Sequence, residues 1–409
     1  MRTMKRVAAV ALSVVVLMTS GVSAKAAVTD VQPAKSSSEA VLKWAKKVGE
    51  PFDEKTYANN TVSKIKLVGN YLYVADDAKH RIMKIDKKDG TILKEQKYCD
   101  ESYIQGYVSS IGYGDGKVYV GYDNGRVQAF DENTLESLWI TDENKNAINS
   151  DFVFTNGKLY FGTTAKTTDW YDNGAPFSYY VVTTSDDDKT KPDEEKTMKK
   201  VVESKTGKFY LKKGVVLGKY IVISDTAGTL TMIDTTNDKV TDTKDIGEAF
   251  SGNITYDEMT GTIYFVAGTN DLYGIKVSAD GKLKDEKKVR LYETGYSSTT
   301  PEVYNGKVYV SGSKGKAFQD KGYMAVADVS SDKYKVNYTV ELSNYSQCEP
   351  TIVKTGENSV RVYFTINDEP GGIYAIEDSK DATSATLETV YEPTGDIKNT
   401  GCMSDVVVD

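Results

Sequence analysis

Histidine and cysteine are scarce in this chain. Its 409 residues include one His and three Cys, which excludes a histidine-rich metal site and a zinc module built from several thiolates. A catalytic triad is disfavoured as well, because His80 is the one histidine that could act as its base. Three cysteines also exclude a fold held together by several disulfides. His80 follows an Asp-Asp-Ala-Lys segment, so we expect it in a solvated hairpin turn.

Basic charge and proline are also limited. The net charge is −8, which disfavours nucleic acid as a partner, because sequence-independent binding to phosphates requires a basic surface. The chain has 8 Pro beside 29 Tyr, a balance that favours strands over helices. Hydrophobic residues make up 39% of the sequence, enough for a sizeable core. We therefore expect a folded, β-rich, acidic protein.

The first 26 residues have the layout of a secretory signal peptide. A basic start precedes an apolar run from Val7 to Met18, and small residues follow it. The run is too short to span a bilayer comfortably, although an uncleaved anchor is the alternative. We expect a signal peptide over 1–26, a linker over 27–38 and a folded domain over 39–409. The expected location is secreted or cell-surface, with no membrane span after cleavage.

One short phrase recurs along the chain. It is a turn that usually contains Gly, followed by alternating β-branched and aromatic residues, and successive copies begin 41 to 61 residues apart. Further short alternating segments and tight turns follow most copies, so that about 40 residues hold four strands, as in a propeller blade. The copies begin at Gly69, Gly116, Gly157, Gly218, Gly261 and Gly306, with a looser copy at Ser359.

These repeats predict an all-β fold, a β-propeller of four-stranded blades with seven recognisable units and a partial eighth. The partial unit begins near Lys398, and residues 41–48, which include Trp44, are expected to supply its outer strand. The last blade then lacks its middle strands, so the chain looks truncated and the full protein eight-bladed; seven blades with a two-stranded patch is the alternative. The seven units span residues 60–98, 107–141, 150–204, 207–246, 250–292, 297–342 and 347–392.

Acidic residues end several of the expected third strands. Their spacing could suggest a metal site or a general acid. Because Asp accepts hydrogen bonds from turn amides, we interpret them instead as structural turn residues. They are Asp86, Asp131, Asp234, Asp328 and Glu377.

The segment 116–139, with its Gly-Lys-Val-Tyr-Val-Gly start, its Asp-Asn-Gly turn and its Leu-Trp end, resembles the repeat of quinoprotein-type (PQQ-like) β-propellers. The resemblance extends over about 60–409. The segment Pro370–Ile376 is also similar to a late blade of secreted propellers from gut-type Gram-positive bacteria. The resemblance implies a propeller fold and, for the dehydrogenases of the family, a quinone cofactor, calcium and a vicinal cysteine pair.

The sequence departs from the dehydrogenases where the cofactor would bind. Cys99, Cys348 and Cys402 are far apart, and the chain has 3 Trp in all, too few for one in each blade. We therefore expect no cofactor, no metal and no catalytic residues. In an oxidising compartment Cys348 and Cys402 could pair, because both precede inner strands; three unpaired thiols are the alternative.

The third unit is longer than the others because of two insertions. One joins its second and third strands, and its ligand-binding candidates are Trp170, Tyr171, Asp172, Asn173 and Phe177. Aromatic faces beside Asp and Asn suit sugars or peptides, although the aromatic side chains could simply pack the insertion down. The other insertion, from Asp186 to Lys200, is charged and is expected to be a loop or a short exposed helix.

The sequence thus favours a non-catalytic, secreted or cell-surface binding scaffold for a protein or glycan, acting as a monomer. The ligand would meet the face that carries the insertion and the other turns between second and third strands. A quinone- or metal-dependent dehydrogenase is one alternative function. An extracytoplasmic assembly scaffold is another.

Overall fold

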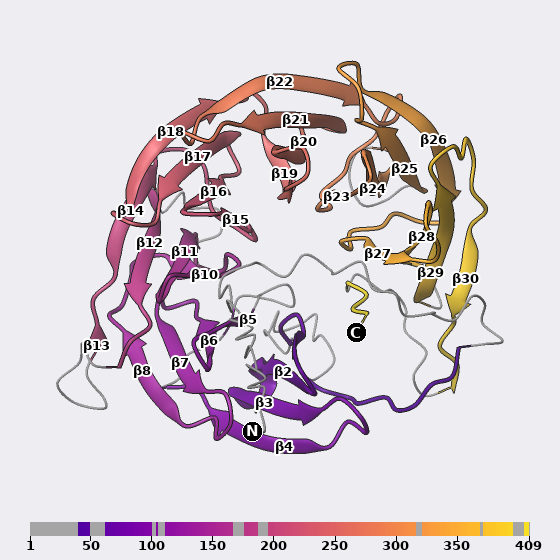
Figure 1. Ribbon diagram of the computed structural model, residues 1–409. Helices are drawn as coiled ribbons and strands as arrows, with labels where there is room; N and C mark the ends of the chain where they lie inside the picture. The colour runs from indigo at the N-terminus through magenta and orange to yellow at the C-terminus, as the bar shows by residue number, and fades with distance from the viewer. Residues whose placement is uncertain are drawn as a thin grey trace, which may run out of the picture.

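Strands arranged in a ring make up almost all of the computed structural model (Figure 1). It describes residues 40–49, 62–99, 104, 111–166, 176–186, 195–315, 321–368, 371–395 and 405–408. These residues contain seven antiparallel sheets, each with a four-stranded meander whose first strand lies nearest the centre. The predicted β-propeller is therefore confirmed. In the described part of the chain, the helical elements amount to one short 3-10 turn, Asp77–Lys79.

The first three blades contain the following strands. Blade one has β1 (Lys66–Val68), β2 (Tyr71–Asp76), β3 (Arg81–Asp86) and β4 (Ile92–Lys97). Blade two has β5 (Ile111–Gly114), β6 (Lys117–Gly121), β7 (Val127–Asp131) and β8 (Ser137–Thr141). Blade three has β10 (Val153–Thr155), β11 (Lys158–Thr164), β12 (Phe177–Thr183) and β14 (Lys199–Ser204), with the short strands β9 (Ala147–Ile148) and β13 (Glu195–Lys196) nearby.

The last four blades are more regular. Blade four has β15 (Val215–Leu217), β16 (Tyr220–Ser224), β17 (Thr229–Asp234) and β18 (Lys239–Asp245), and blade five has β19 (Phe250–Asp257), β20 (Thr262–Ala267), β21 (Asp271–Val277) and β22 (Leu283–Arg290). Blade six has β23 (Glu302–Tyr304), β24 (Lys307–Ser313), β25 (Gly322–Asp328) and β26 (Lys335–Leu342), and blade seven has β27 (Thr351–Lys354), β28 (Ser359–Ile366), β29 (Gly372–Ser379) and β30 (Glu388–Tyr391). Each blade falls within its predicted unit.

The core lies between the blades. One buried cluster joins Tyr309 and Val326 of blade six to Val362 of blade seven, and another joins Met232 of blade four to Phe265 of blade five. Each sheet covers an apolar face of the next, so the hydrophobic effect holds neighbouring blades together.

The recurring Gly-Lys-x-Tyr phrase adds polar contacts at these junctions. Tyr160 Oη and Lys158 Nζ in blade three lie 2.7 and 2.8 Å from Asp238 Oδ1 in blade four. Tyr309 donates in the same way to Asp378 of blade seven, at 2.7 Å. The tyrosines predicted on equivalent strands do occupy second strands: Tyr73, Tyr119, Tyr160, Tyr264 and Tyr309.

Four of the five predicted turn acids accept hydrogen bonds from turn amides. Asp131 Oδ1 accepts the N–H groups of Asn133 and Thr134, both at 2.8 Å, and Asp86, Asp234 and Asp328 accept one each. Hydrogen bonds from Thr236 and Lys219 lower the pKa of Asp234 to about 2. Glu377 differs, because its carboxylate lies 3.2 Å from Arg361.

The described end of the second insertion in blade three contains a strand. β13 pairs in parallel with β8, so this segment adds a fifth strand to the neighbouring blade two. Lys196 of β13 lies over the Trp139 ring, 4.8 Å from its centroid, and donates to the carbonyl of Thr183 in blade three. The expected loop or helix is therefore wrong for residues 195–196, because strand pairing and the tryptophan ring hold this part against blade two.

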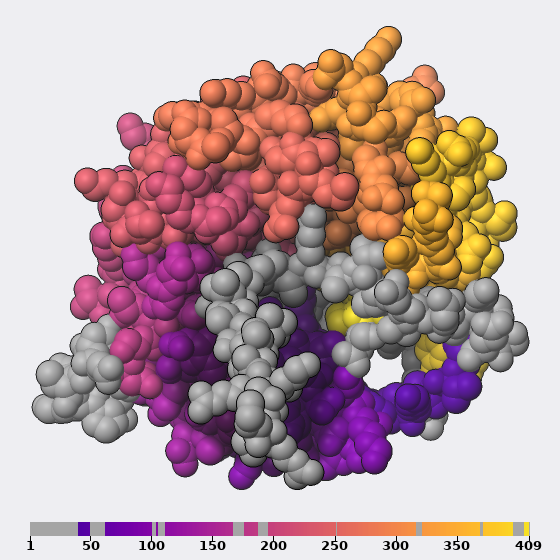
Figure 2. Space-filling view, in the orientation of Figure 1, coloured from indigo at the N-terminus to yellow at the C-terminus, as the bar shows by residue number. Residues whose placement is uncertain are grey.

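Two terminal segments lie between blade seven and blade one. The indigo residues 40–49 run along the rim and the yellow residues 405–408 lie near the axis (Figures 1 and 2). These are the outer and inner positions expected for the partial eighth unit, but neither segment is a strand. The Trp44 indole instead donates to the Lys87 carbonyl at 2.9 Å and covers Gly90 in the turn between β3 and β4. The predicted outer strand is therefore wrong, since Trp44 packs on blade one.

Neither Cys99 nor Cys348 forms a disulfide. Cys348 is buried and hydrogen-bonds with Ser346 and Thr365, so the structure does not contain the suggested disulfide; Cys402 and the expected signal peptide lie outside the described residues. The described chain has no helix long and apolar enough to cross a membrane.

Candidate functional site

Polar residues gather on the propeller axis, where the inner strands begin. Lys64, Asp151, Lys213 and Glu349 each lie two residues before the first strand of their blade, and Glu302 is the first residue of β23. The topology of the ring places these five positions, from blades one, three, four, six and seven, close to its centre (Figure 1). Together with Asp405, we call these residues the axial cluster.

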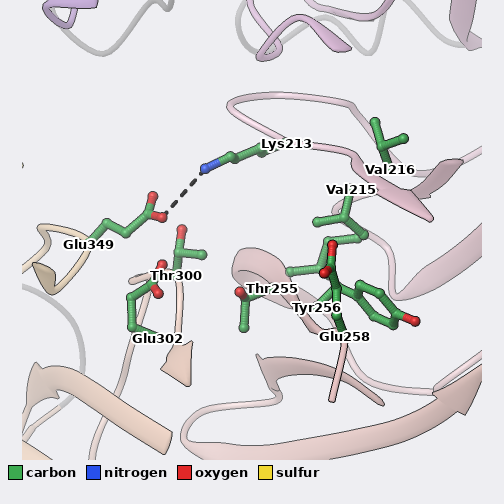
Figure 3. A pocket seen from close by; sticks show the side chains of 10 residues that line it. Lys213, Val215, Val216, Thr255, Tyr256, Glu258, Thr300, Glu302 and Glu349 are labelled. Atoms are coloured by element: carbon green, nitrogen blue, oxygen red, sulfur yellow. Dashed lines mark hydrogen bonds and ion pairs between the residues drawn. The ribbon is translucent and has the colours of Figure 1, made fainter. Parts of the chain in front are cut away.

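Ion pairs and hydrogen bonds connect the cluster. Lys64 Nζ lies 2.9 Å from Asp405 Oδ2, and the other oxygen of Asp405 accepts the N–H of Glu349 at 2.8 Å. Glu349 Oε1 in turn lies 3.4 Å from Lys213 Nζ, as Figure 3 shows. Asn253 of blade five accepts the N–H of Lys213 at 2.9 Å. The contacts therefore link four blades and the C-terminal segment.

The charges of the cluster shift each other's pKa values. The Glu349 carboxylate holds the pKa of Lys213 above its ordinary value. Burial opposes ionisation of Glu349, but Lys213 and a hydrogen bond with Glu302 hold its pKa below the usual range. Burial raises the pKa of Asp151 despite the nearby Lys64. Lys213 and Glu349 therefore favour each other's charged form.

The cavity beside this pair is small. Its volume is about 30 Å³, room for about two or three water molecules, since one water needs ~10–15 Å³ of such volume. Figure 3 shows Lys213 and Glu349 at one side, with Thr255, Thr300 and Glu302 nearby. A substrate of ordinary size cannot enter this cavity, so the arrangement is suited to holding the blades in place.

The residues that would hold a quinone cofactor do not fit such a group. The cavity beside Lys213 and Glu349 is too small for a ring system, and no two cysteines are adjacent. The described residues contain no group of three or more His, Cys, Asp or Glu side chains with the geometry of a metal site. Burial also raises the pKa of the Cys348 thiol to about 11, which keeps it protonated and unreactive.

The structure describes only one of the five ligand-binding candidates from the blade-three insertion. Trp170, Tyr171, Asp172 and Asn173 lie outside the described residues. Phe177 lies in β12, is 1% exposed and packs in the core between blades three and four. Its ring is therefore unsuited to contact a ligand from solvent.

The turns expected to surround the insertion do lie at the equivalent ends of their blades, as the shared meander requires. Their polar side chains are largely occupied. Asn270 is fully buried and donates to the Tyr292 carbonyl at 2.8 Å, and Asp271 pairs with Arg290. Asn367 donates to the Tyr345 hydroxyl at 2.5 Å. These side chains stabilise the turns and offer little to a ligand.

Sequence reasoning missed the axial cluster, although a signal was present. Aligning the repeats at the inner strand places Ser63-Lys64, Ser150-Asp151, Lys212-Lys213, Cys348-Glu349 and Ser404-Asp405 at one position. The most regular part of the repeat phrase lies on the second strand. An alignment based on it therefore gives little weight to the residues that precede the inner strand. His80, by contrast, is exposed in a turn at the end of the 3-10 segment, as expected.

Comparisons with known proteins support the fold. No protein-family model and no curated protein matches the sequence. Among solved structures, BamB from Moraxella catarrhalis superimposes with a TM-score of 0.56 at 12% identity, covering 85% of this chain and 91% of BamB. The quinohemoprotein alcohol dehydrogenase from Comamonas testosteroni gives 0.51 at 12% identity, covering 81% and 67%. A computationally designed protein, Ika8, gives 0.54 at 10%, covering 84% and 89%. Similarity at such low identity shows a shared β-propeller fold and leaves function open.

Proposed function

We propose that this chain is a non-catalytic, extracytoplasmic β-propeller that binds a protein or glycan partner as a monomer. The observation that carries the proposal is the axial cluster, whose ion pairs link the inner ends of several blades beside a cavity of about 30 Å³. Because this cavity among the described residues has no room for a substrate, we place recognition on loops at the surface.

The proposed recognition surface is the face that carries the first insertion of blade three. One end of that insertion is anchored: the Asn146 side-chain amide donates to the Pro176 carbonyl at 3.3 Å, and the neighbouring Phe177 is buried. A rigid base reduces the entropy lost when a loop binds. Trp170, Tyr171, Asp172 and Asn173 remain the proposed ligand-contacting residues, and the N-terminal segment the proposed secretion signal.

A quinone-dependent dehydrogenase is the second candidate, because quinohemoprotein alcohol dehydrogenases are among the similar structures. The small axial cavity and the separated cysteines weigh against it. An extracytoplasmic assembly scaffold is compatible with the first proposal and differs only in the identity of the partner.

The two candidates are separated by adding pyrroloquinoline quinone and calcium to the purified protein. We expect no alcohol-dependent dye reduction. We also expect no rise in melting temperature, which a bound cofactor would cause because it would stabilise the folded state. A rise that requires both additives would favour the dehydrogenase. On protein and glycan arrays, the same preparation should bind a partner. The Trp170→Ala substitution should weaken this binding by about 1–3 kcal/mol.

A further inference from the structure

A larger cavity opens between blades five, six and seven, on the face of the ring opposite to the face that carries the first blade-three insertion. Its volume is about 390 Å³, within the ~300–1,000 Å³ typical of small-molecule sites. Turns between first and second strands form its wall, together with the residues that follow β29. We call it the turn-face pocket, and the lining residues that matter here are Tyr304, Asn305, Lys307, Asn358, Asp378 and Lys380.

The inner wall of the turn-face pocket is a buried ion pair. Lys307 Nζ lies 2.9 and 3.1 Å from the two oxygens of Asp378, which is 3% exposed. Tyr309 and Tyr338 donate to the same carboxylate at 2.7 and 2.5 Å. Because four donor contacts satisfy the Asp378 oxygens, the carboxylate is a rigid part of the wall and is not available to a ligand.

The junction of blades three and four differs from that of blades six and seven in what the asparagine of the turn contacts. Asn156 and Asn305 occupy the same turn position, directly before the Gly of the repeat phrase, with φ of 52° and 47°. The Asn156 amide donates to Thr235 of the next blade at 3.1 Å. At the position of Thr235, blade seven has Asp378, which is already saturated. Among the described residues, nothing hydrogen-bonds the side-chain amides of Asn305 and Asn358, and both residues are exposed.

The lining has the chemistry that sugars require. The half-buried Tyr304 offers an aromatic surface, and Met259, another lining residue, is 83% exposed; such apolar surfaces pack against the C–H groups of a sugar ring. Side-chain amides both donate and accept, as sugar hydroxyls do. Lys380 is exposed and makes no ion pair with any described residue, so it adds an uncompensated positive charge. This charge favours a sugar that carries a carboxylate.

We propose that the turn-face pocket binds one sugar unit of a glycan, and prefers a uronic acid to a neutral hexose. Asn305 and Asn358 pair with hydroxyls, Tyr304 packs against the ring and Lys380 pairs with the carboxylate. This inference extends the proposed glycan binding to a second face, and it does not depend on the blade-three insertion.

The test is an NMR titration of the isotopically labelled full chain with methyl glucuronide, methyl glucoside and acetate. We expect both glycosides to shift the side-chain amide signals of Asn305 and Asn358, with tighter binding of the glucuronide. Asn305→Gly keeps the left-handed backbone conformation and removes the amide, so glucuronide binding should weaken about two- to tenfold, the loss of one hydrogen bond to a bound ligand. Asn156→Gly is the matched control and should leave binding unchanged.

A second variant separates sugar binding from anion binding. Lys380→Gln lies on the surface and should fold normally; it should remove the preference for glucuronide while glucoside still binds. Absence of shifts with both glycosides, equal shifts with acetate, or unchanged binding by Asn305→Gly would each overturn the proposal. None of these results bears on the axial cavity, so the quinone experiment tests the proposed function separately.

Discussion

At the scale of single residues, the burial of Asp77 is the clearest pH-sensitive feature. Asp77 follows β2, is 3% exposed and accepts the N–H of Ile104 at 2.9 Å. Burial raises the pKa of its carboxyl to about 7, although this hydrogen bond and His80 oppose the shift and the neighbouring Asp76 and Asp123 reinforce it. Within the described residues, the other carboxylate oxygen has no hydrogen-bond partner.

The raised pKa of Asp77 predicts that the protein loses stability as pH rises. The folded state holds a proton that the unfolded state releases between pH about 4 and 7, so the free energy of unfolding falls across this window. The free energy of unfolding measured in urea should be higher at pH 5 than at pH 8, and Asp77 should account for about 2–4 kcal/mol of this difference. Asp77→Asn should reduce the difference, whereas Glu357→Gln, at an exposed carboxyl, should not. An identical pH profile for wild type and Asp77→Asn would contradict the assignment.

At the scale of elements, the second strands do more than pair within their sheets. The Lys and Tyr of the repeat phrase point toward the next blade, and at two junctions they contact a carboxylate there: Lys158 and Tyr160 with Asp238, and Lys307 and Tyr309 with Asp378. In blade two the equivalent Tyr119 donates to the Gly114 carbonyl of its own blade, at 3.1 Å. The same phrase therefore serves two kinds of contact.

This difference predicts unequal costs for removing the hydroxyl. Tyr309→Phe leaves the buried Asp378 carboxylate with one donor fewer and should destabilise the protein by about 1.5–3 kcal/mol, as for a hydrogen bond to a charged group. Tyr119→Phe, at the same strand position with a neutral acceptor, should cost about 0.5–1.5 kcal/mol. Chemical denaturation of both variants measures the two losses. A larger loss for Tyr119→Phe would contradict the proposed role of Asp378.

At the scale of the whole molecule, the position between blades seven and one is the least regular part of the ring. The residues near the axis there contact both blades: Asp405 accepts from Glu349 and the carbonyl of Val406 accepts from Thr351, both in blade seven, while Asp405 also pairs with Lys64 of blade one. The rim segment instead holds to blade one through Trp44 and Val48, which pack beside Met83. Both segments therefore contact blade one, and the segment near the axis also connects it to blade seven.

Trp44 should consequently matter for blade one. Trp44→Ala removes the hydrogen bond to Lys87 and the ring that covers Gly90, and should cost about 1–3 kcal/mol for a half-buried aromatic residue. Hydrogen exchange should become faster in β3 and β4. Val41→Ala, in the same segment and 80% exposed, should leave exchange unchanged. Unchanged exchange in Trp44→Ala would show that the rim segment does not support the blade.

The sequence alone determined the class of fold, the limits of seven blades, the equivalent tyrosines and four of the five turn acids, because these follow from local patterns: strand alternation, glycine turns and short-range hydrogen bonds. Only the tertiary structure decided what the polar residues do. The axial cluster combines residues as distant as Lys64 and Asp405, and Asn305 differs from Asn156 only in what the next blade presents. The same holds for Phe177, an aromatic residue beside an insertion whose burial depends on packing between blades three and four. Contacts between blades cross long sequence separations, and no local period encodes them.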